Sequence, residues 1–153
     1  MNPANSFVVF TLDEQRYALL LSAVARVVPV VEITPLPKAP AIVLGVVNVQ
    51  GRILPVVNLR GRFHLPEREL RLSDQCIIAR TLTRTVALVV DRVSGVLEVS
   101  DQAVIAAEQI LPSMTYVAGV VKLEDGMVLI HDLDQLLSLD EEEALDQALS
   151  PNP

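Results

Sequence analysis

A valine-rich segment with a central glycine constrains the fold more than any other part of the sequence. Residues 45–59 read GVVNVQGRILPVVNL, which is two apolar runs on either side of Gln50-Gly51. β-branched residues favour strands, and glycine accepts the positive φ of a tight hairpin turn. The segment therefore predicts a β-hairpin whose apolar arms are buried on both faces. Pro55 has no backbone N–H, so we expect it at a sheet edge or a bulge.

The same pattern occurs a second time. Residues 119–133 read GVVKLEDGMVLIHDL and align with residues 45–59 without a gap, with the turn replaced by EDG. The preceding segments also match, since residues 17–24 lie over residues 86–93. Chance would explain either match alone, but two matches in the same order indicate one β unit used twice. Because the unit boundaries are not sharp, the first strands could be exchanged between the halves.

The composition agrees with a β fold and limits the classes of function. The hydrophobic fraction is 51% while aromatic residues make up 3%, so the core is expected to be aliphatic. The formal net charge of −7 argues against binding to nucleic acid, whose phosphates require a basic surface. The only cysteine, Cys76, lies in an apolar strand-like run, which is typical of an inert thiol in a reducing compartment. No apolar run reaches the roughly 18 residues of a membrane span, so we expect a cytoplasmic protein without direct membrane insertion.

The sequence predicts a mainly β domain over residues 1–153 with two small barrels, one for each repeat. The first barrel is placed at approximately 16–65, and the second at approximately 75–133 plus the N-terminal strand. A C-terminal helix is expected at 134–149, with the acidic run 140–143 as its solvated first turn, where acids complement the helix dipole. An apolar seam between the barrels would form a groove for a peptide or a helix.

Residues that could support catalysis are few and far apart. His64 and His131 are the only histidines, and together with Cys76 they give no spacing typical of metal ligands. His131-Asp132 could in principle act as an acid–base pair, although a polar strand end explains the two residues better. Asp91 could be the carboxylate of a site, or else form a turn or a local ion pair. We therefore predict no metal, no cofactor and no catalytic residue, and an interaction module instead of an enzyme.

Several segments together carry a resemblance to a known family. The most specific is the run Gly-x-x-Asn-x-x-Gly-x-Φ-x-Pro-Φ-Φ-x-Leu-Arg at residues 45–60, where Φ is apolar. Further points of likeness are residues 7–10, 17–19, Val24, Val27, Pro37, Pro40 and 89–93. In these features the chain resembles the CheW family, the coupling proteins of bacterial chemosensory arrays. The resemblance implies two SH3-like five-stranded β-barrel subdomains, related by duplication, with a C-terminal helix.

The resemblance also implies a function and a set of contact residues. Members of the family are non-catalytic adaptors in chemotaxis signal transduction. They bind the cytoplasmic tip of a methyl-accepting chemoreceptor and the regulatory domain of a CheA-type histidine kinase, which has the same fold. The partner-binding residues carried over to this sequence are Val24, Arg26, Val27, Gly45, Asn48, Gln50, Gly51 and Val96. For Val27 and Asn48 in particular, a role in the core or in the turn would explain the residue equally well.

Three alternatives stay open on the sequence alone. The chain could couple receptors to another output, such as surface sensing or pili. It could be a small-molecule-binding β-barrel, which would need polar groups that converge in a pocket. It could be an enzyme that uses His131 and Asp132. In addition, open barrel edges can pair with a like edge, which allows weak self-association.

The hairpin turn departs from the family pattern and generates a first prediction. Family members commonly carry Asn-x-Arg-Gly there, with the arginine implicated in partner contact, whereas this chain has Gln50. Glutamine cannot make the forked, charge-assisted contact that arginine makes to a carboxylate. Arg26 stands where some members have an acid. We expect Gln50→Arg to change the affinity for the cognate receptor tip, measured by titration calorimetry; an unchanged affinity would remove Gln50 from the interface.

Overall fold

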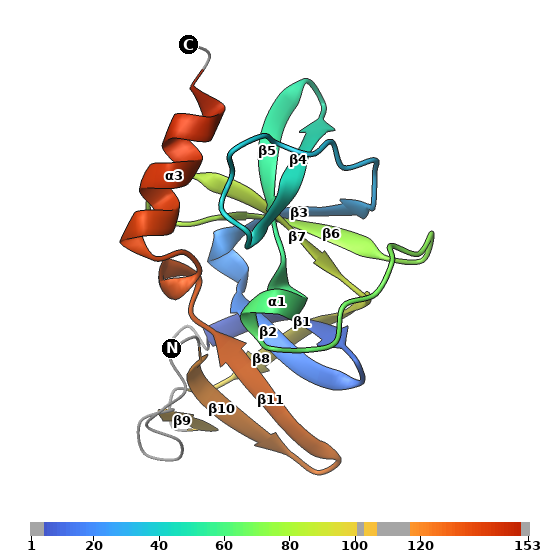
Figure 1. Ribbon diagram of the computed structural model, residues 1–153. Helices are drawn as coiled ribbons and strands as arrows, with labels where there is room; N and C mark the ends of the chain where they lie inside the picture. Colours follow the sequence, from blue (N-terminus) through green and yellow to red (C-terminus); the bar gives the residue numbers. More distant parts are fainter. Residues whose placement is uncertain (1–4, 101–102, 107–116, 151–153) are drawn as a thin grey trace.

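The computed structural model describes residues 5–100, 103–106 and 117–150, and it contains two β-sheets and a C-terminal helix (Figure 1). The first sheet has the order β3-β6-β7-β5-β4, with β3 (Val24–Pro29), β4 (Val43–Val49), β5 (Arg52–Val57), β6 (Gln75–Arg80) and β7 (Thr85–Val90). The second has the order β8-β1-β2-β11-β10-β9, with β1 (Asn5–Leu12), β2 (Gln15–Leu20), β8 (Arg92–Val99), β9 (Val104–Ala106), β10 (Val117–Leu123) and β11 (Gly126–His131). The helical elements are η1 (Leu21–Ala23), α1 (Leu59–Arg62), η3 (Leu133–Gln135) and α3 (Leu139–Leu149).

The predicted fold class is confirmed, since the protein is mainly β with two SH3-like subdomains and a C-terminal helix. The second sheet has six strands instead of the expected five, because the short β9 adds to β10. Within the described residues the strands of each sheet form an open series and not a closed ring. None of the described helices is long and apolar enough to cross a membrane.

The two repeated hairpins have the same geometry. β4 pairs with β5 as far as Val49↔Arg52, and β10 pairs with β11 as far as Leu123↔Gly126, so each hairpin turns over two residues. Both hairpins also carry a register shift at the equivalent place, immediately before Gly45 in one and before Gly119 in the other. The ungapped alignment of the two segments therefore holds at the level of strand register.

The two halves of the chain exchange strands. β2 pairs in parallel with β11, and β7 pairs in parallel with β5. The partners are equivalent in the repeat, because Ala18 lies opposite Ile130 in one sheet and Ala87 lies opposite Val56 in the other. The second strand of each hairpin, β5 or β11, has one edge that its hairpin partner does not cover. A strand of the other repeat pairs with that edge.

The sheets consequently divide the chain differently from the predicted boundaries. The first sheet draws its strands from residues 24–90, and the second draws its strands from residues 5–20 and 92–131. The predicted divisions at 16–65 and 75–133 instead cut across both sheets. The predicted divisions correspond to the two sequence repeats. The hydrogen-bonded sheets do not, because each sheet includes strands of the other repeat.

Alternate residues of the central strands face two different cores. In β2, Tyr17 and Leu19 face a core shared by both sheets, while Ala18 faces a core of the second sheet alone. The shared core consists of Phe10, Leu12, Tyr17, Leu19, Val57, Leu59, Ile77, Ala79, Val86, Leu88, Val90, Leu133 and Leu136. The core of the second sheet consists of Phe7, Val9, Ala18, Val121, Val128 and Ile130. The core of the first sheet consists of Val47, Leu54, Val56, Cys76, Ile78 and Ala87.

Cys76 is fully buried in the core of the first sheet, as predicted for an inert thiol. Burial raises the pKa of this thiol to about 11, so it stays protonated at neutral pH. A protonated thiol is a poor nucleophile. Cys76 is therefore a packing residue.

The prediction that the first hairpin is buried on both faces is wrong for its outer part. Leu44 is 40% exposed and Ile53 is 57% exposed. Burial alternates along β4, so one face of this strand is open to solvent. Pro55 lies on the inner strand β5, but the pairing of β5 with β7 begins only at Val56. Pro55 therefore pairs with β4 alone, as a residue without a backbone N–H requires.

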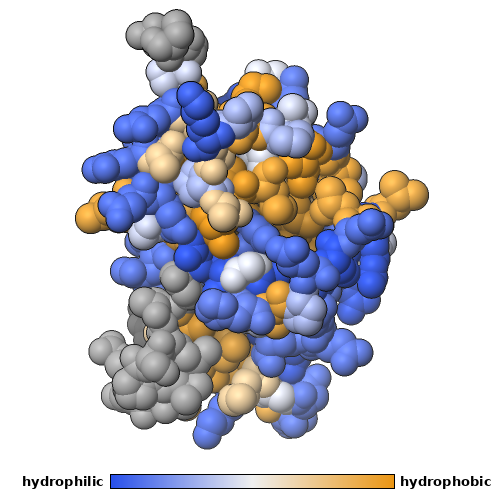
Figure 2. Space-filling model, viewed as in Figure 1, coloured by the Kyte–Doolittle hydropathy of each residue, from blue (hydrophilic) through white to orange (hydrophobic). Residues whose placement is uncertain are grey.

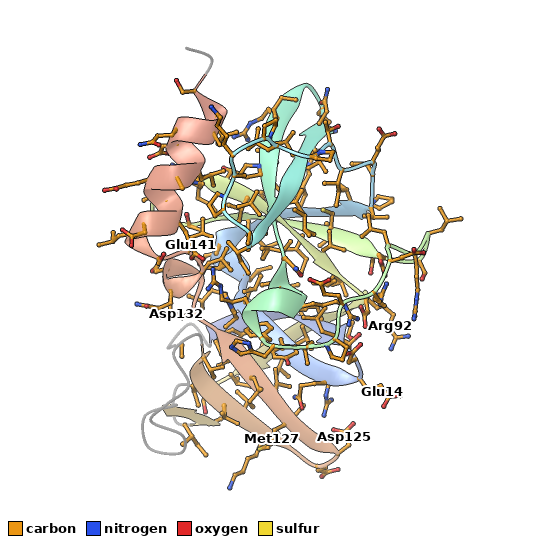
Figure 3. All side chains as sticks on the ribbon, in the orientation of Figure 1. Glu14, Arg92, Asp125, Met127, Asp132 and Glu141 are labelled. Atoms are coloured by element: carbon orange, nitrogen blue, oxygen red, sulfur yellow. The ribbon has the colours of Figure 1, made fainter. Side chains whose placement is uncertain are left out.

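The C-terminal helix is docked on the first sheet through its acidic first turn. α3 begins with a capping box, in which the Ser138 hydroxyl accepts the Glu141 N–H and Glu141 accepts the Ser138 N–H. Glu141 also pairs with Arg62 of α1 at 2.7 Å, and it faces the body of the molecule (Figure 3). Glu142 pairs with Arg84, beside the β6–β7 turn, at 2.8 Å. The expectation of a merely solvated acidic turn is therefore wrong.

Gly45 occupies a position where a side chain does not fit. The segment after β3 returns to the sheet at Thr34, which exchanges two backbone hydrogen bonds with Val46. A Cβ atom on Gly45 would lie 2.2 Å from the Thr34 carbonyl oxygen, and Gly45 has φ +153°. We expect Gly45→Ala to lower the free energy of unfolding by about 2–5 kcal/mol, measured by urea denaturation.

Gly51→Ala is the matched control for this substitution. Gly51 has φ +86°, but a Cβ atom there would meet no described atom within 4 Å. Only the backbone strain remains, which costs about 1–2 kcal/mol. Equal losses for the two variants would show that the contact with Thr34 does not determine the stability.

Candidate functional site

Three of the predicted partner-binding residues lie on β3, an edge strand of the first sheet. The pairing of β3 with β6 shifts register between Val24 and Arg26. Val24 is half-buried and packs against the shared core. Arg26 is exposed, and Val27 is 37% exposed. The strand thus presents a cation and an apolar side chain to solvent, while Val24 also serves the core.

A second group lies at the tip of the β4–β5 hairpin. Gln50 and Gly51 form the turn with φ values of +51° and +86°, as a two-residue type I′ turn requires. The Asn48 side chain accepts the Gly51 N–H at 2.8 Å, so it stabilises this turn. Gly45 is buried at the base of the hairpin and has the steric role described above. Gln50 is the member of this group whose exposed side chain is not engaged in shaping the hairpin.

Val96 lies on the other sheet. It is 58% exposed on β8, which forms one edge of the second sheet. Its neighbour Gly95 has φ +139°. The predicted residues therefore form three groups: one hairpin and one edge strand of the first sheet, and one edge strand of the second.

Sequence reasoning missed further exposed apolar residues near these groups. Leu44, Ile53 and Val31 are each at least 40% exposed. Figure 2 shows that apolar side chains gather over the first sheet, at the upper right of the view. A signal was available in β4, because Leu44 and Asn48 share one face of the strand at a spacing of four residues. The polar Asn48 marks that face as open to solvent.

A cluster of ion pairs lies where the chain passes from the first sheet to the second. Asp91 stands between β7 and β8, and its carboxylate accepts from Arg60 of α1 at 2.7 Å and from Arg68. Arg60 also pairs with Asp13 in the β1–β2 turn at 2.8 Å. Arg68 makes a forked contact to Asp74, with N–O distances of 2.7 and 3.0 Å. Asp91 thus forms ion pairs, but with arginines 23 and 31 residues away and not with a neighbour in the chain, as a local ion pair would require. The cluster joins both sheets to the segment 63–74.

The charges in this cluster shift the pKa of Asp91 downwards. Burial alone would raise the pKa of this carboxyl, but hydrogen bonds from Arg60, from the Asp13 backbone N–H and from Arg68 outweigh it. The pKa of Asp74 is lowered by Arg68 in the same way, again against the effect of burial. Both carboxylates are therefore ionised and engaged at neutral pH, which suits a structural role and not proton transfer.

His131 and Asp132 do not form an acid–base pair. His131 is 4% exposed, and its ring makes an edge contact with Phe63 at 5.0 Å between ring centroids. Burial, followed by the nearby Arg62, lowers the pKa of His131 to about 4, so the ring is neutral. The Asp132 carboxylate accepts the Asp134 N–H at 3.0 Å and caps η3. His131 is thus a core residue and not the polar strand end that the sequence predicts.

A metal site has no support in the described part of the chain. In residues 5–100, 103–106 and 117–150, no group of three His, Cys, Asp or Glu side chains could hold a metal ion. Asp13, Asp74 and Asp91 are each bound to arginine. What the geometry does offer is exposed apolar surface on the outer strands of two sheets.

Comparison with known proteins agrees with this fold. The family model described as CheW-like domain matches residues 6–141. The chain is 31% identical over 145 residues to Chemotaxis protein CheW of Rhizobium meliloti (strain 1021), covering 94% of each protein. It is 32% identical over 128 residues to Chemotaxis protein CheW of Thermotoga maritima, covering 84% of each. The crystal structure of scaffolding protein TtCheW from Thermoanaerobacter tengcongensis superposes with a TM-score of 0.81 at 29% identity, covering 90% of this chain and 95% of that one.

The ion cluster leads to a prediction about pH. The pKa of Asp91 is lower in the folded protein than its ordinary value of about 4, so its ionised form stabilises the fold above that pH. This stabilisation is lost as the pH falls through the folded pKa. We expect Asp91→Asn to lower the free energy of unfolding by about 1–3 kcal/mol at pH 7. We also expect it to flatten the fall in stability between about pH 5 and pH 3, measured by urea denaturation at each pH.

Asp125→Asn provides the control, because Asp125 also pairs with an arginine but its side chain is 77% exposed. This variant should stay close to the wild-type curve at every pH, since exposed pairs are screened by solvent. If Asp91→Asn retained the full acid sensitivity, other groups and not Asp91 would be responsible for it.

Proposed function

Because the chain belongs to the CheW-like domain family, we propose that it is a non-catalytic adaptor of chemotaxis signalling. In this role it couples the cytoplasmic tips of methyl-accepting chemoreceptors to a CheA-type histidine kinase. The observation that carries the proposal is the family match over residues 6–141. The relatives named above are chemotaxis proteins, and the similar solved structure is a scaffolding protein.

Coupling needs two contact surfaces that keep a fixed relation to each other. The proposal is supported by the edge strand β3 on one sheet and the edge strand β8 on the other, each with an exposed valine. The shared core and the Asp91 cluster hold the two sheets together, so the two edges keep a fixed relation to each other. Edge strands with free backbone groups suit a second β domain, and the regulatory domain of the kinase is of this kind.

The hairpin tip supplies a different kind of surface. Gln50 and Gly51 project at the turn, and Arg26 and Arg52 are exposed cations on the same sheet. A glycine turn permits close approach, and cations favour a partner with carboxylates. These features fit the side of a receptor helix pair. The adaptor would act in the cytoplasm, where the receptor tips lie.

The other hypotheses have less support. The cores of the two sheets are filled by aliphatic side chains, such as Val47 and Val56 in the first and Val121 and Val128 in the second. An interior site for a small molecule would need that space. The enzyme hypothesis needs His131 and Asp132 to act together, and they face different neighbours. Coupling to another output, such as pili, uses the same surfaces and differs only in the identity of the partners.

Affinity purification of the tagged chain tests the proposal. Wild-type protein should retain both a chemoreceptor and a histidine kinase from cells that express them. We expect Val96→Asp to weaken binding of the kinase regulatory domain at least about tenfold, because a charge replaces an apolar contact at the strand edge. Titration calorimetry with the isolated regulatory domain measures this change.

Met127→Asp is the matched control. Met127 is also apolar and 50% exposed, and it lies near the tip of the β10–β11 hairpin (Figure 3). The Met127→Asp variant should bind the regulatory domain with wild-type affinity. Recovery of neither partner by the wild-type chain would refute the coupling function. Equal losses for both variants would refute the role of β8.

A further inference from the structure

A pocket at one end of the first sheet is lined in part by the Asp91 ion cluster. Its volume is about 360 Å³, which is enough for a small group or a few side chains. It lies between the β4 strand, the segment that leads to Thr34, and the segment 63–74. Six aliphatic residues line it: Ile33, Leu44, Val57, Leu59, Leu70 and Val89. None of the eight proposed partner-binding residues lines the pocket.

The floor of the pocket is charged, and its ions are paired with one another, although the Arg68 Nε–H has no hydrogen-bond partner among the described residues. Arg60 and Arg68 line it together with Asp74 and Asp91, and these four residues bind one another in the ion cluster. Asp91 also takes the backbone N–H of Asp13. An incoming ion would have to displace these contacts, so the floor does not by itself select a ligand.

The acidic residues at the rim of the pocket, in contrast to those on its floor, are not paired with arginine in the described part of the chain. Glu67 and Glu69 line it and are exposed, and no described residue gives either carboxylate a hydrogen bond or an ion pair. They are two residues apart in a stretch without helical structure, and both belong to the wall of the same pocket. Two carboxylates without an ion-pair partner among the described residues therefore line a cavity that has both aliphatic and charged walls.

We propose that this pocket binds a lysine or arginine side chain of a partner polypeptide. The aliphatic stem of such a residue lies along Leu44 and Leu70, which are 40% and 46% exposed, and its cationic head reaches the two rim carboxylates. An anionic ligand is disfavoured by the rim. A purely apolar ligand would leave both carboxylates uncompensated. The pocket shares none of the eight partner-binding residues, although Leu44 adjoins Gly45 of the hairpin, and the proposal does not depend on the coupling role.

The test uses the ¹⁵N-labelled full chain and Nα-acetyl-lysine N-methylamide as the probe, followed by amide chemical shifts. Saturable shifts are expected at Leu44 and at residues 67–70, with a roughly millimolar Kd. The norleucine analogue, which has a similar chain without the charge, should bind several-fold more weakly. Glu67→Gln combined with Glu69→Gln should weaken the lysine probe about fivefold, since two exposed ion pairs are lost.

The matched control is Glu124→Gln combined with Glu143→Gln, which makes the same change in net charge at exposed positions that do not line the pocket. This control should bind the probe like the wild type. Equal weakening by both double variants, shifts scattered outside the pocket, or equal affinity for norleucine would each overturn the proposal. Pentylammonium, which lacks the peptide groups, should bind more weakly than the lysine probe. Equal or tighter binding would refute the proposal that the ligand is part of a polypeptide.

Discussion

Both faces of the central strands are apolar, and this constraint governs the whole architecture. A strand such as β2 must bury Ala18 on one side and Tyr17 and Leu19 on the other. One curled sheet can cover only its inner face, so the outer face requires a second sheet. The shared core satisfies both sheets at once. Neither sheet is therefore expected to be stable in water without the other, and the two edges proposed for partners have a fixed relation.

Electrostatic contacts strengthen the arrangement at the points where the chain crosses between sheets. Asp91 lies at the crossing from β7 to β8 and binds residues from the β1–β2 turn, from α1 and from the segment that precedes β6. The helix α3 follows the strands of the second sheet in the chain, but ion pairs with Arg62 and Arg84 hold it on the first sheet. Charges thus reinforce the apolar contacts of these segments, which include Leu59 of α1 in the shared core and the fully buried Leu145 of α3.

The sequence predicted those features that depend on local pattern. The hairpins, their shared register and the buried Cys76 follow from strand periodicity and from the glycine turns, so two repeated β units were foreseeable. Their SH3-like form was an expectation from the family resemblance. The ion cluster was not, because Asp13, Arg60 and Asp91 are far apart in the chain and meet only in the fold. His131 was misjudged for the same reason, since the ring that covers it belongs to Phe63. The candidate surfaces were located through the family resemblance, because an exposed valine such as Val96 has no chemical signature of its own.

The exchange of strands also determines when each strand can pair with its neighbours during synthesis on the ribosome. The N-terminal hairpin of β1 and β2 leaves the exit tunnel first, yet its neighbours β8 and β11 are synthesised only after the entire first sheet. All strands of the first sheet, which lie between residues 24 and 90, have been synthesised while β1 and β2 still lack their neighbours. Such distant pairing slows folding and leaves apolar edges open to other chains. The β1–β2 hairpin therefore lacks the neighbours of both its strands until after the strands of the first sheet have been synthesised.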